Sequence, residues 1–191
     1  MLNSALLEFA TWLDGLAWTN GIHESLYLYN WIETTHVLAL MLSLGMLFMI
    51  DLRMLGLALP NVPASKLAER LDAPMLIGFT IMLLTGLLLY SAIPVRTTQS
   101  LWFRIKVILL IAAAVNAWIF RKHMKSGVWE RDLAPPRRAK IGAGLSLALW
   151  CGVIVTGRFI AYDWFDCGQP GNSAFINWAA GCLAESTGSS E

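Results

Sequence analysis

The sequence predicts an all-α integral membrane protein, a bundle of four transmembrane helices, and three observations carry this prediction. The 191 residues are 57% hydrophobic and only 14% charged, with a mean hydropathy of +0.57. A soluble domain of this size cannot hide that much apolar surface. Four stretches are each apolar over about the 20 residues that a membrane-crossing helix needs. The basic residues gather in two of the connections. We therefore treat residues 1–191 as a single membrane domain.

The N-terminal segment, at about residues 4–18, predicts a helix that lies in the membrane interface. Leu6, Leu7 and Phe9 are interspersed with acidic and polar residues, and no basic residue precedes them. A cleavable signal peptide begins with a basic region, which this segment lacks. An amphipathic interfacial helix is therefore the better interpretation.

The four membrane spans follow in order, and we predict them at about residues 27–57, 74–93, 101–120 and 141–162. The first is longer than the hydrocarbon core requires, so we expect it to tilt or to project into water. Small residues on the second and fourth spans would allow close helix contacts, including those of a homo-oligomer. The outer faces are expected to contact membrane lipids.

The distribution of lysine and arginine predicts the orientation. The connection after the first span contains Arg53, Lys66 and Arg70, and seven basic residues lie between positions 121 and 140. The segment before the first span and the tail at 163–191 contain none. By the positive-inside rule both termini lie outside, which is the periplasm for a multi-pass protein of the bacterial inner membrane.

The three cysteines fit this topology. Cys167 and Cys182 both fall in the predicted external tail, where an oxidising compartment allows a disulfide to persist. Closing this loop would stabilise the tail by about 3 kcal/mol in the chain-entropy description. Cys151 lies inside the fourth span and is interpreted as a small packing residue. The chain has no CxxC pair, which argues against a thiolate metal site, and no phosphate-binding loop or nucleophile motif; we expect no nucleic-acid partner.

Charged and ionisable side chains inside the spans are candidate functional residues, because they are costly in a bilayer. Glu33, His36, Lys106 and Arg158 all lie within two turns of the outer ends of their spans. At about 100° per residue, the first span places His36 on a stripe that should face the bundle. That stripe comprises Tyr29, Ile32, His36, Leu40, Ser43 and Leu47, with Glu33 at its edge.

The other spans contribute stripes of their own to a pocket that opens outward. On the second, Gly78, Met82, Thr85 and Leu89 share one side. On the third, Lys106 lines up with Trp102, Leu110 and Ala113, while Arg104 points away. On the fourth, the expected inward stripe comprises Gly144, Leu147, Cys151, Ile154, Arg158 and Tyr162.

A b-type haem is the first interpretation of this pocket. His36 would be the axial iron ligand, Gly78 would leave room for the porphyrin, and Lys106 and Arg158 would meet the propionates. The second ligand is open: Met82 or His23 would serve, or the iron would be five-coordinate. Such a protein would transfer electrons in the membrane, with a quinone or a periplasmic redox partner.

Two alternatives stay open at this point. Soft thioethers select Cu(I), and six methionines, at positions 41, 46, 49, 54, 75 and 82, favour copper handling. Helical phase opposes a continuous copper path, because Met41 and Met49 lie away from His36. In the other alternative, Glu33, His36, Lys106 and Arg158 form a buried salt-bridge network in a structural or assembly subunit without a ligand.

Three segments carry a family resemblance. HVLALMLSLGMLFMIDLRMLG (36–56), LWFRIKVILLIAAAVN (101–116) and SLALWCGVIVTGRFIAY (146–162) resemble a family of bacterial inner-membrane proteins of unknown function with four transmembrane helices, over about residues 20–162. More distantly they resemble the copper-resistance CopD-like and the HemJ-like membrane proteins. The HemJ-like resemblance implies haem b at His36 and a polar role for Lys106, and the CopD-like one implies copper uptake. The chain departs from both in having one intramembrane histidine.

Overall fold

The computed structural model describes residues 2–124, 136–162, 165–167 and 171–182, and the regular elements in these ranges are all helices. In chain order they are α1 (Leu2–Asp14), α2 (Ala17–Glu24), α3 (Leu26–Leu55), α4 (Ala64–Ala92), α5 (Pro94–Thr98), α6 (Leu101–Met124), α7 (Arg137–Ile160) and α8 (Ala174–Ala180). The helices α3, α4, α6 and α7 are long and apolar enough to cross a membrane. This confirms the prediction of four long apolar helices.

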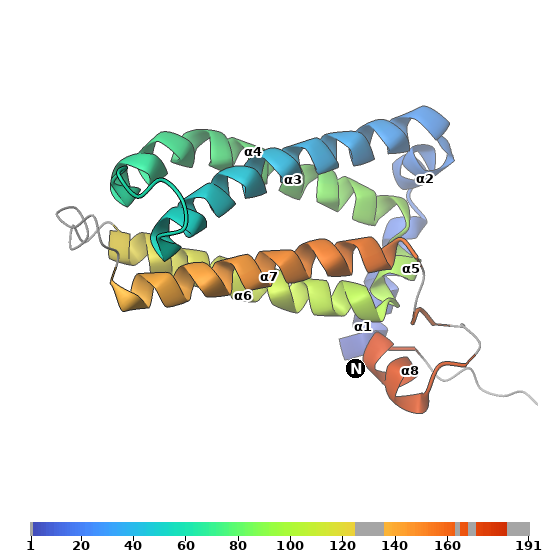
Figure 1. Ribbon diagram of the computed structural model, residues 1–191. Coiled ribbons are helices and arrows are strands. Elements are labelled where there is room, and N and C mark those ends of the chain that lie inside the picture. Colours follow the sequence, from blue (N-terminus) through green and yellow to red (C-terminus); the bar gives the residue numbers. More distant parts are fainter. Residues whose placement is uncertain (1, 125–135, 163–164, 168–170, 183–191) are drawn as a thin grey trace, which may run out of the picture.

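The four long helices form two antiparallel hairpins (Figure 1). α3 packs along α4, α6 packs along α7, and the hairpins meet chiefly where α3 contacts α7. The short helices α1, α2, α5 and α8 gather at one end of the bundle, which we name the cap end. The connection between α3 and α4 lies at the opposite end, the loop end.

Local signals set the ends of α3. The Ser25 hydroxyl accepts a hydrogen bond from the Leu28 amide at 3.1 Å, which caps the first turn. Gly56 ends the helix with a left-handed φ of 82°, a conformation that costs a glycine little. The 30 residues of α3 span about 45 Å at 1.5 Å per residue. The helix is therefore longer than the hydrocarbon core, as its sequence predicted.

Two boundary predictions need correction. The second span was expected to begin at residue 74, but α4 begins at Ala64 and contains Pro74. A proline lacks the amide hydrogen for one backbone hydrogen bond, and its ring crowds the carbonyl one turn earlier. The helix nevertheless continues through Pro74. The expected single interfacial helix at 4–18 is two helices, α1 and α2, with a break at Gly15 and Leu16. Helices α5 and α8 were not predicted.

The interior of the bundle contains two apolar clusters. Leu44, Ala113, Trp150 and Val153 fill the middle, and Ile50, Met54, Ala139 and Ala143 fill the loop end. Large apolar side chains on all four long helices face outward, including Leu42, Leu83, Ile108 and Leu145. Outward apolar faces are what a helix needs in order to contact lipid, so the exposure fits membrane spans.

One residue of α7 faces opposite to its prediction. Cys151 is exposed, whereas it was expected to pack inside the bundle. The buried residues of α7 are Ala139, Ala143, Ser146, Trp150, Val153 and Thr156. The helix is therefore turned so that the bulky Trp150, which contacts Phe79 at a centroid distance of 5.1 Å, lies in the core.

The closest contact between α3 and α4 is at Gly78. A Cβ atom on Gly78 would lie 2.2 Å from the Ser43 hydroxyl oxygen and 3.4 Å from the Ser43 Cβ. The Ser43 hydroxyl in turn donates to the Ala39 carbonyl at 2.6 Å. The position expected to leave room for a porphyrin is therefore filled by α3.

We predict that Gly78→Ala destabilises the bundle by about 1–3 kcal/mol, because the added methyl overpacks this contact. Ser43→Ala should relieve the effect in the double variant, giving a favourable interaction energy. Gly144→Ala is the control: no atom lies within 4 Å of its Cβ position, so it should be neutral or stabilising. Thermal unfolding in detergent, followed by circular dichroism, measures the wild type, the two single variants, the double variant and Gly144→Ala. Equal stability of Gly78→Ala and wild type would contradict the close contact.

Candidate functional site

The His36 ring is held by Thr85 on the neighbouring helix. His36 Nδ1 lies 2.9 Å from the Thr85 hydroxyl oxygen, and the Thr85 hydroxyl lies 2.7 Å from the Ile81 carbonyl, to which it donates. A hydroxyl has one hydrogen to donate. When the Thr85 hydroxyl donates its hydrogen to the Ile81 carbonyl, His36 Nδ1 must carry a proton and donate it in a hydrogen bond to the Thr85 oxygen. Donation from Thr85 to Ile81 thus corresponds to the Nδ1–H tautomer with a lone pair on Nε2, whereas donation from Thr85 to Nδ1 corresponds to the Nε2–H tautomer.

Gly86 makes the space for this ring. A Cβ atom at Gly86 would lie 3.2 Å from His36 Cε1, so a larger residue would press on the imidazole. The sequence put Thr85 on the inward stripe of α4, and the structure confirms that face, since Gly78 and Thr85 are buried. Gly86 was not predicted as part of the site. Its one indication in the sequence is its position directly after Thr85, the polar residue that contacts His36.

Lys106 approaches the same region from α6. Its ammonium would lie 3.4 Å from a Cβ on Gly157 of α7, so the side chain lies along the bare backbone of the facing helix. Its charge also acts on the His36 ring. No ion pair joins Lys106 to a carboxylate among the described residues. A half-buried ammonium without an acidic partner among the described residues is a candidate for binding an anionic group.

The remaining two charged candidates lie outside this group. Arg158 is exposed; its Nε donates to the Tyr162 hydroxyl at 3.2 Å and its guanidinium stacks over the Tyr162 ring at 5.1 Å. The prediction that the Arg158 stripe faces the bundle is wrong, because Trp150 turns α7 the other way. Glu33 is exposed on α3. Within the described ranges no ion pair joins Glu33, His36, Lys106 and Arg158.

The side chains of the candidates for a second metal ligand have other surroundings. The Met82 side chain packs against the apolar cluster in the middle of the bundle. His23 is exposed near the end of α2. The described residues contain no group of three or more His, Cys, Asp or Glu side chains that could hold a metal ion. Among the residues that the structure describes, His36 is the one imidazole within the four stretches that are long and apolar enough to cross a membrane, and the second ligand stays a prediction.

The tail is fastened to the cap end by covalent and polar contacts. Cys167 and Cys182 form a disulfide, which confirms the predicted pairing. The Cys167 amide donates to the Gln99 carbonyl at 3.3 Å. Arg104, which was expected to point away from the Lys106 side of its helix, donates to the Asn3 side chain at 3.0 Å, and its guanidinium occupies the space beside Gly181. These contacts join α1, α6 and the segment after α8.

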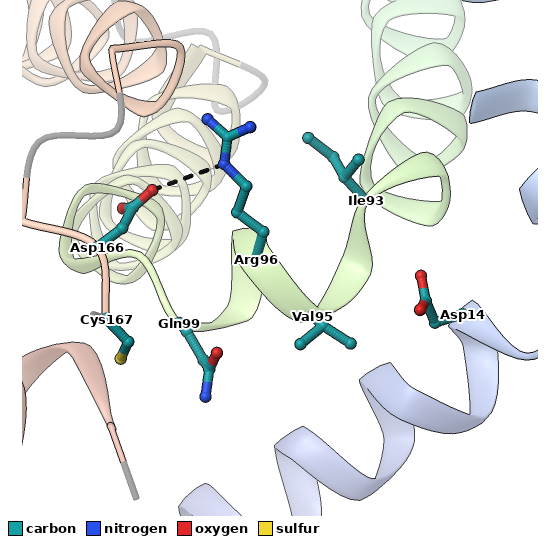
Figure 2. Close-up of a pocket in the computed structure, with 7 residues that line it drawn as sticks. All are labelled: Asp14, Ile93, Val95, Arg96, Gln99, Asp166 and Cys167. Atoms are coloured by element: carbon teal, nitrogen blue, oxygen red, sulfur yellow. Dashed lines mark ion pairs between the residues drawn. The ribbon is translucent and has the colours of Figure 1, made fainter. Parts of the chain in front are cut away.

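A hollow of about 350 Å³ lies at the cap end, between α1, α5 and the tail. Figure 2 shows Arg96 reaching toward Asp166, with Asp14 on the other side of the view. Arg96 Nε and Asp166 Oδ2 are 3.8 Å apart, while Asp166 Oδ1 is buried without a hydrogen-bond partner among the described residues. The acidic groups do not converge on one point, so we interpret the hollow as part of the tail's attachment.

Burial raises the pKa of the Asp166 carboxyl above its usual range. The nearby Ser100 hydroxyl and the Arg96 guanidinium oppose this increase only in part. The folded chain therefore keeps a proton on Asp166 at a pH where the unfolded chain has released it.

The comparison with known proteins gives a family match. A family described as "Family of unknown function (DUF6644)" matches residues 17–163, which contain α2 to α7 and all of the polar groups around His36. No curated protein matches the chain. No solved structure matches it either.

We predict that the attachment of the tail weakens as the pH rises from about 4, the usual range of an aspartate, through the raised pKa of Asp166. Hydrogen exchange of the Cys167 amide, corrected for its intrinsic rate, measures this. Asp166→Asn should make the protection independent of pH over that window. Asp14→Asn, on the opposite side of the same hollow, should leave the dependence in place. A persistent dependence in Asp166→Asn would show that another group controls the attachment.

Proposed function

Since the chain belongs to DUF6644, a family of unknown function, we propose its function from the geometry alone: a membrane protein that binds haem b through His36 and takes part in electron transfer. The observation that carries the proposal is the contact that holds the His36 ring through Nδ1, which lies 2.9 Å from the Thr85 hydroxyl oxygen. In the Nδ1–H tautomer, Thr85 accepts this hydrogen bond and Nε2 presents a lone pair to a Lewis acid. Histidine ligands of metals are usually oriented in this way, by a second hydrogen bond on the other ring nitrogen.

The residues around His36 fit the two chemical ends of a haem. Nε2 would hold the iron, and Lys106, which has no acidic partner among the described residues, would bind a propionate. The bound group would supply one-electron chemistry that no side chain of the region offers. Arg158 and Gly78 take no part, because Arg158 faces Tyr162 and Gly78 is covered by Ser43.

A quinone bound directly at His36 is less well supported. A quinone carbonyl needs a hydrogen-bond donor, whereas a neutral His36 with Nδ1–H on Thr85 offers an acceptor at Nε2. Protonating Nε2 would place a second cation beside Lys106. A quinone or a periplasmic redox partner therefore enters the proposal as an electron partner and not as the ligand of His36.

We infer the orientation of the protein in the membrane from the disulfide and from the positions of the basic residues. The disulfide-bonded tail lies at the cap end (Figure 1), and disulfides persist in oxidising compartments. Arg53, Lys66 and Arg121 are among the basic residues near the loop end. We therefore place the cap end and both termini outside, in the periplasm of a bacterium, and the loop end in the cytoplasm.

We predict that His36→Ala abolishes the Soret absorbance of protein purified in mild detergent from haem-replete cells, because it removes the iron ligand. Thr85→Val, which keeps the shape but not the hydroxyl, should lower the haem affinity about 10–100-fold. Lys106→Gln should weaken haem binding, while Arg158→Ala, the matched control, should leave it unchanged. The visible spectrum, reduced minus oxidised, and haem titration measure these effects.

Wild-type protein without Soret absorbance would overturn the proposal. If metal analysis of the same sample then found copper that is absent from His36→Ala, the copper alternative would replace it. Absence of both, with a loss of thermal stability in His36→Ala, would favour a structural role for the His36 and Thr85 contact.

A further inference from the structure

A second buried polar group lies near the loop end, remote from His36 along α3. Asp51 is 4% exposed, and its Oδ2 atom has no hydrogen-bond partner among the described residues. Ile50, directly before Asp51, and Met54, three residues after it, belong to the apolar cluster that fills this end. The position is therefore dry, and no feature of the proposed haem site uses it.

Ser146 of α7 is the polar neighbour of Asp51. Its hydroxyl lies within hydrogen-bonding reach of the carboxyl, and Ser146 is itself buried. The two side chains meet across the contact between α3 and α7, which joins the two hairpins. One hydroxyl can satisfy one of the two carboxyl oxygens, which agrees with the unpartnered Oδ2.

The nearby cations are directed elsewhere. Arg53, also buried, donates through Nε to the Val62 carbonyl at 2.5 Å and through a terminal nitrogen to the Pro60 carbonyl at 3.2 Å. Arg121 pairs with the exposed Asp72, and Lys140 is exposed. The apolar neighbours of Ile50 and Met54 on the other helices are Ala64, Leu67, Ala68, Leu71 and Met75 of α4, Phe120 of α6, and Ala139 and Ala143 of α7. No described ion pair includes Asp51.

The energetics favour a neutral acid at this position. An ionised carboxylate with a buried, unpartnered oxygen costs several kcal/mol, and a group in that situation takes up a proton instead. An asparagine or leucine would fill the space without a titrating group. We propose that Asp51 and Ser146 form a proton-binding site at the α3–α7 contact, in which Asp51 is a neutral acid that releases its proton when this contact opens toward the loop end. The proposal does not depend on haem binding.

Labelling with the hydrophobic reagent dicyclohexylcarbodiimide tests the site in the wild-type protein. The reagent adds to protonated carboxylic acids, and the modified residue is identified by peptide mass spectrometry. We expect Asp51 to be labelled at pH 6 to 7 and Asp72, which is exposed and paired with Arg121, to remain unlabelled. Labelling should fall about tenfold for each pH unit above the titration of the site. Asp51 unlabelled at pH 6, or labelled no more than Asp72, would overturn the proposal.

The pH dependence of stability gives a second, independent readout. The folded chain would hold a proton that the unfolded chain has released, so the wild-type thermal midpoint should fall as the pH rises from about 5 to 9. Asp51→Asn, of nearly the same shape, should reduce this dependence to the part that Asp166 contributes, and Asp72→Asn should leave it unchanged. Sodium-dependent stabilisation in the wild type, absent in Asp51→Asn, would instead identify a metal-cation site and refute proton binding. An unchanged pH dependence in Asp51→Asn would also refute it.

Discussion

The close packing of α3 on α4 at Ser43 and Gly78 is the contact on which the His36 group depends. His36 lies seven residues before Ser43, and Thr85 lies seven residues after Gly78. Because α3 and α4 are antiparallel, seven residues back along α3 and seven residues forward along α4 lead in the same direction in space. Each step covers about 10.5 Å. The register set by the glycine therefore places the imidazole opposite the threonine hydroxyl. Without a small residue at 78, the backbones would separate and the 2.9 Å contact would be lost.

The two hairpins place their polar groups at different depths. Toward the cap end, His36 and Thr85 of one hairpin face Lys106 of the other, and the ammonium lies against the bare backbone at Gly157. Toward the loop end, Asp51 of α3 meets Ser146 of α7. Between them lies the apolar cluster around Leu44 and Trp150. These polar groups therefore lie at two depths of the bundle, with an apolar layer between them.

The cap end adds rigidity where the proposed site opens. The disulfide closes the tail, and Arg104 binds α1 through Asn3, while Arg96 and Asp166 tie α5 to the tail. Tyr90 of α4 stacks on Phe103 of α6 at a centroid distance of 5.4 Å, which joins the two hairpins at the same end. A ligand held by His36 and Lys106 would therefore be bound between elements whose spacing is already set.

The sequence by itself determined the four long apolar helices, the disulfide, the membership of a family of unknown function and the inward faces of α3 and α4, because length, composition and spacing decide these locally. Only the tertiary structure decided the rotation of α7, which turns Cys151 and Arg158 outward, the continuation of α4 through Pro74, and the pairing of His36 with Thr85. The physical reason is that a helix apolar on every side has no amphipathic stripe to orient it. Its rotation follows from the shapes that meet in the core, here Trp150 against Phe79 and Ser43 against Gly78.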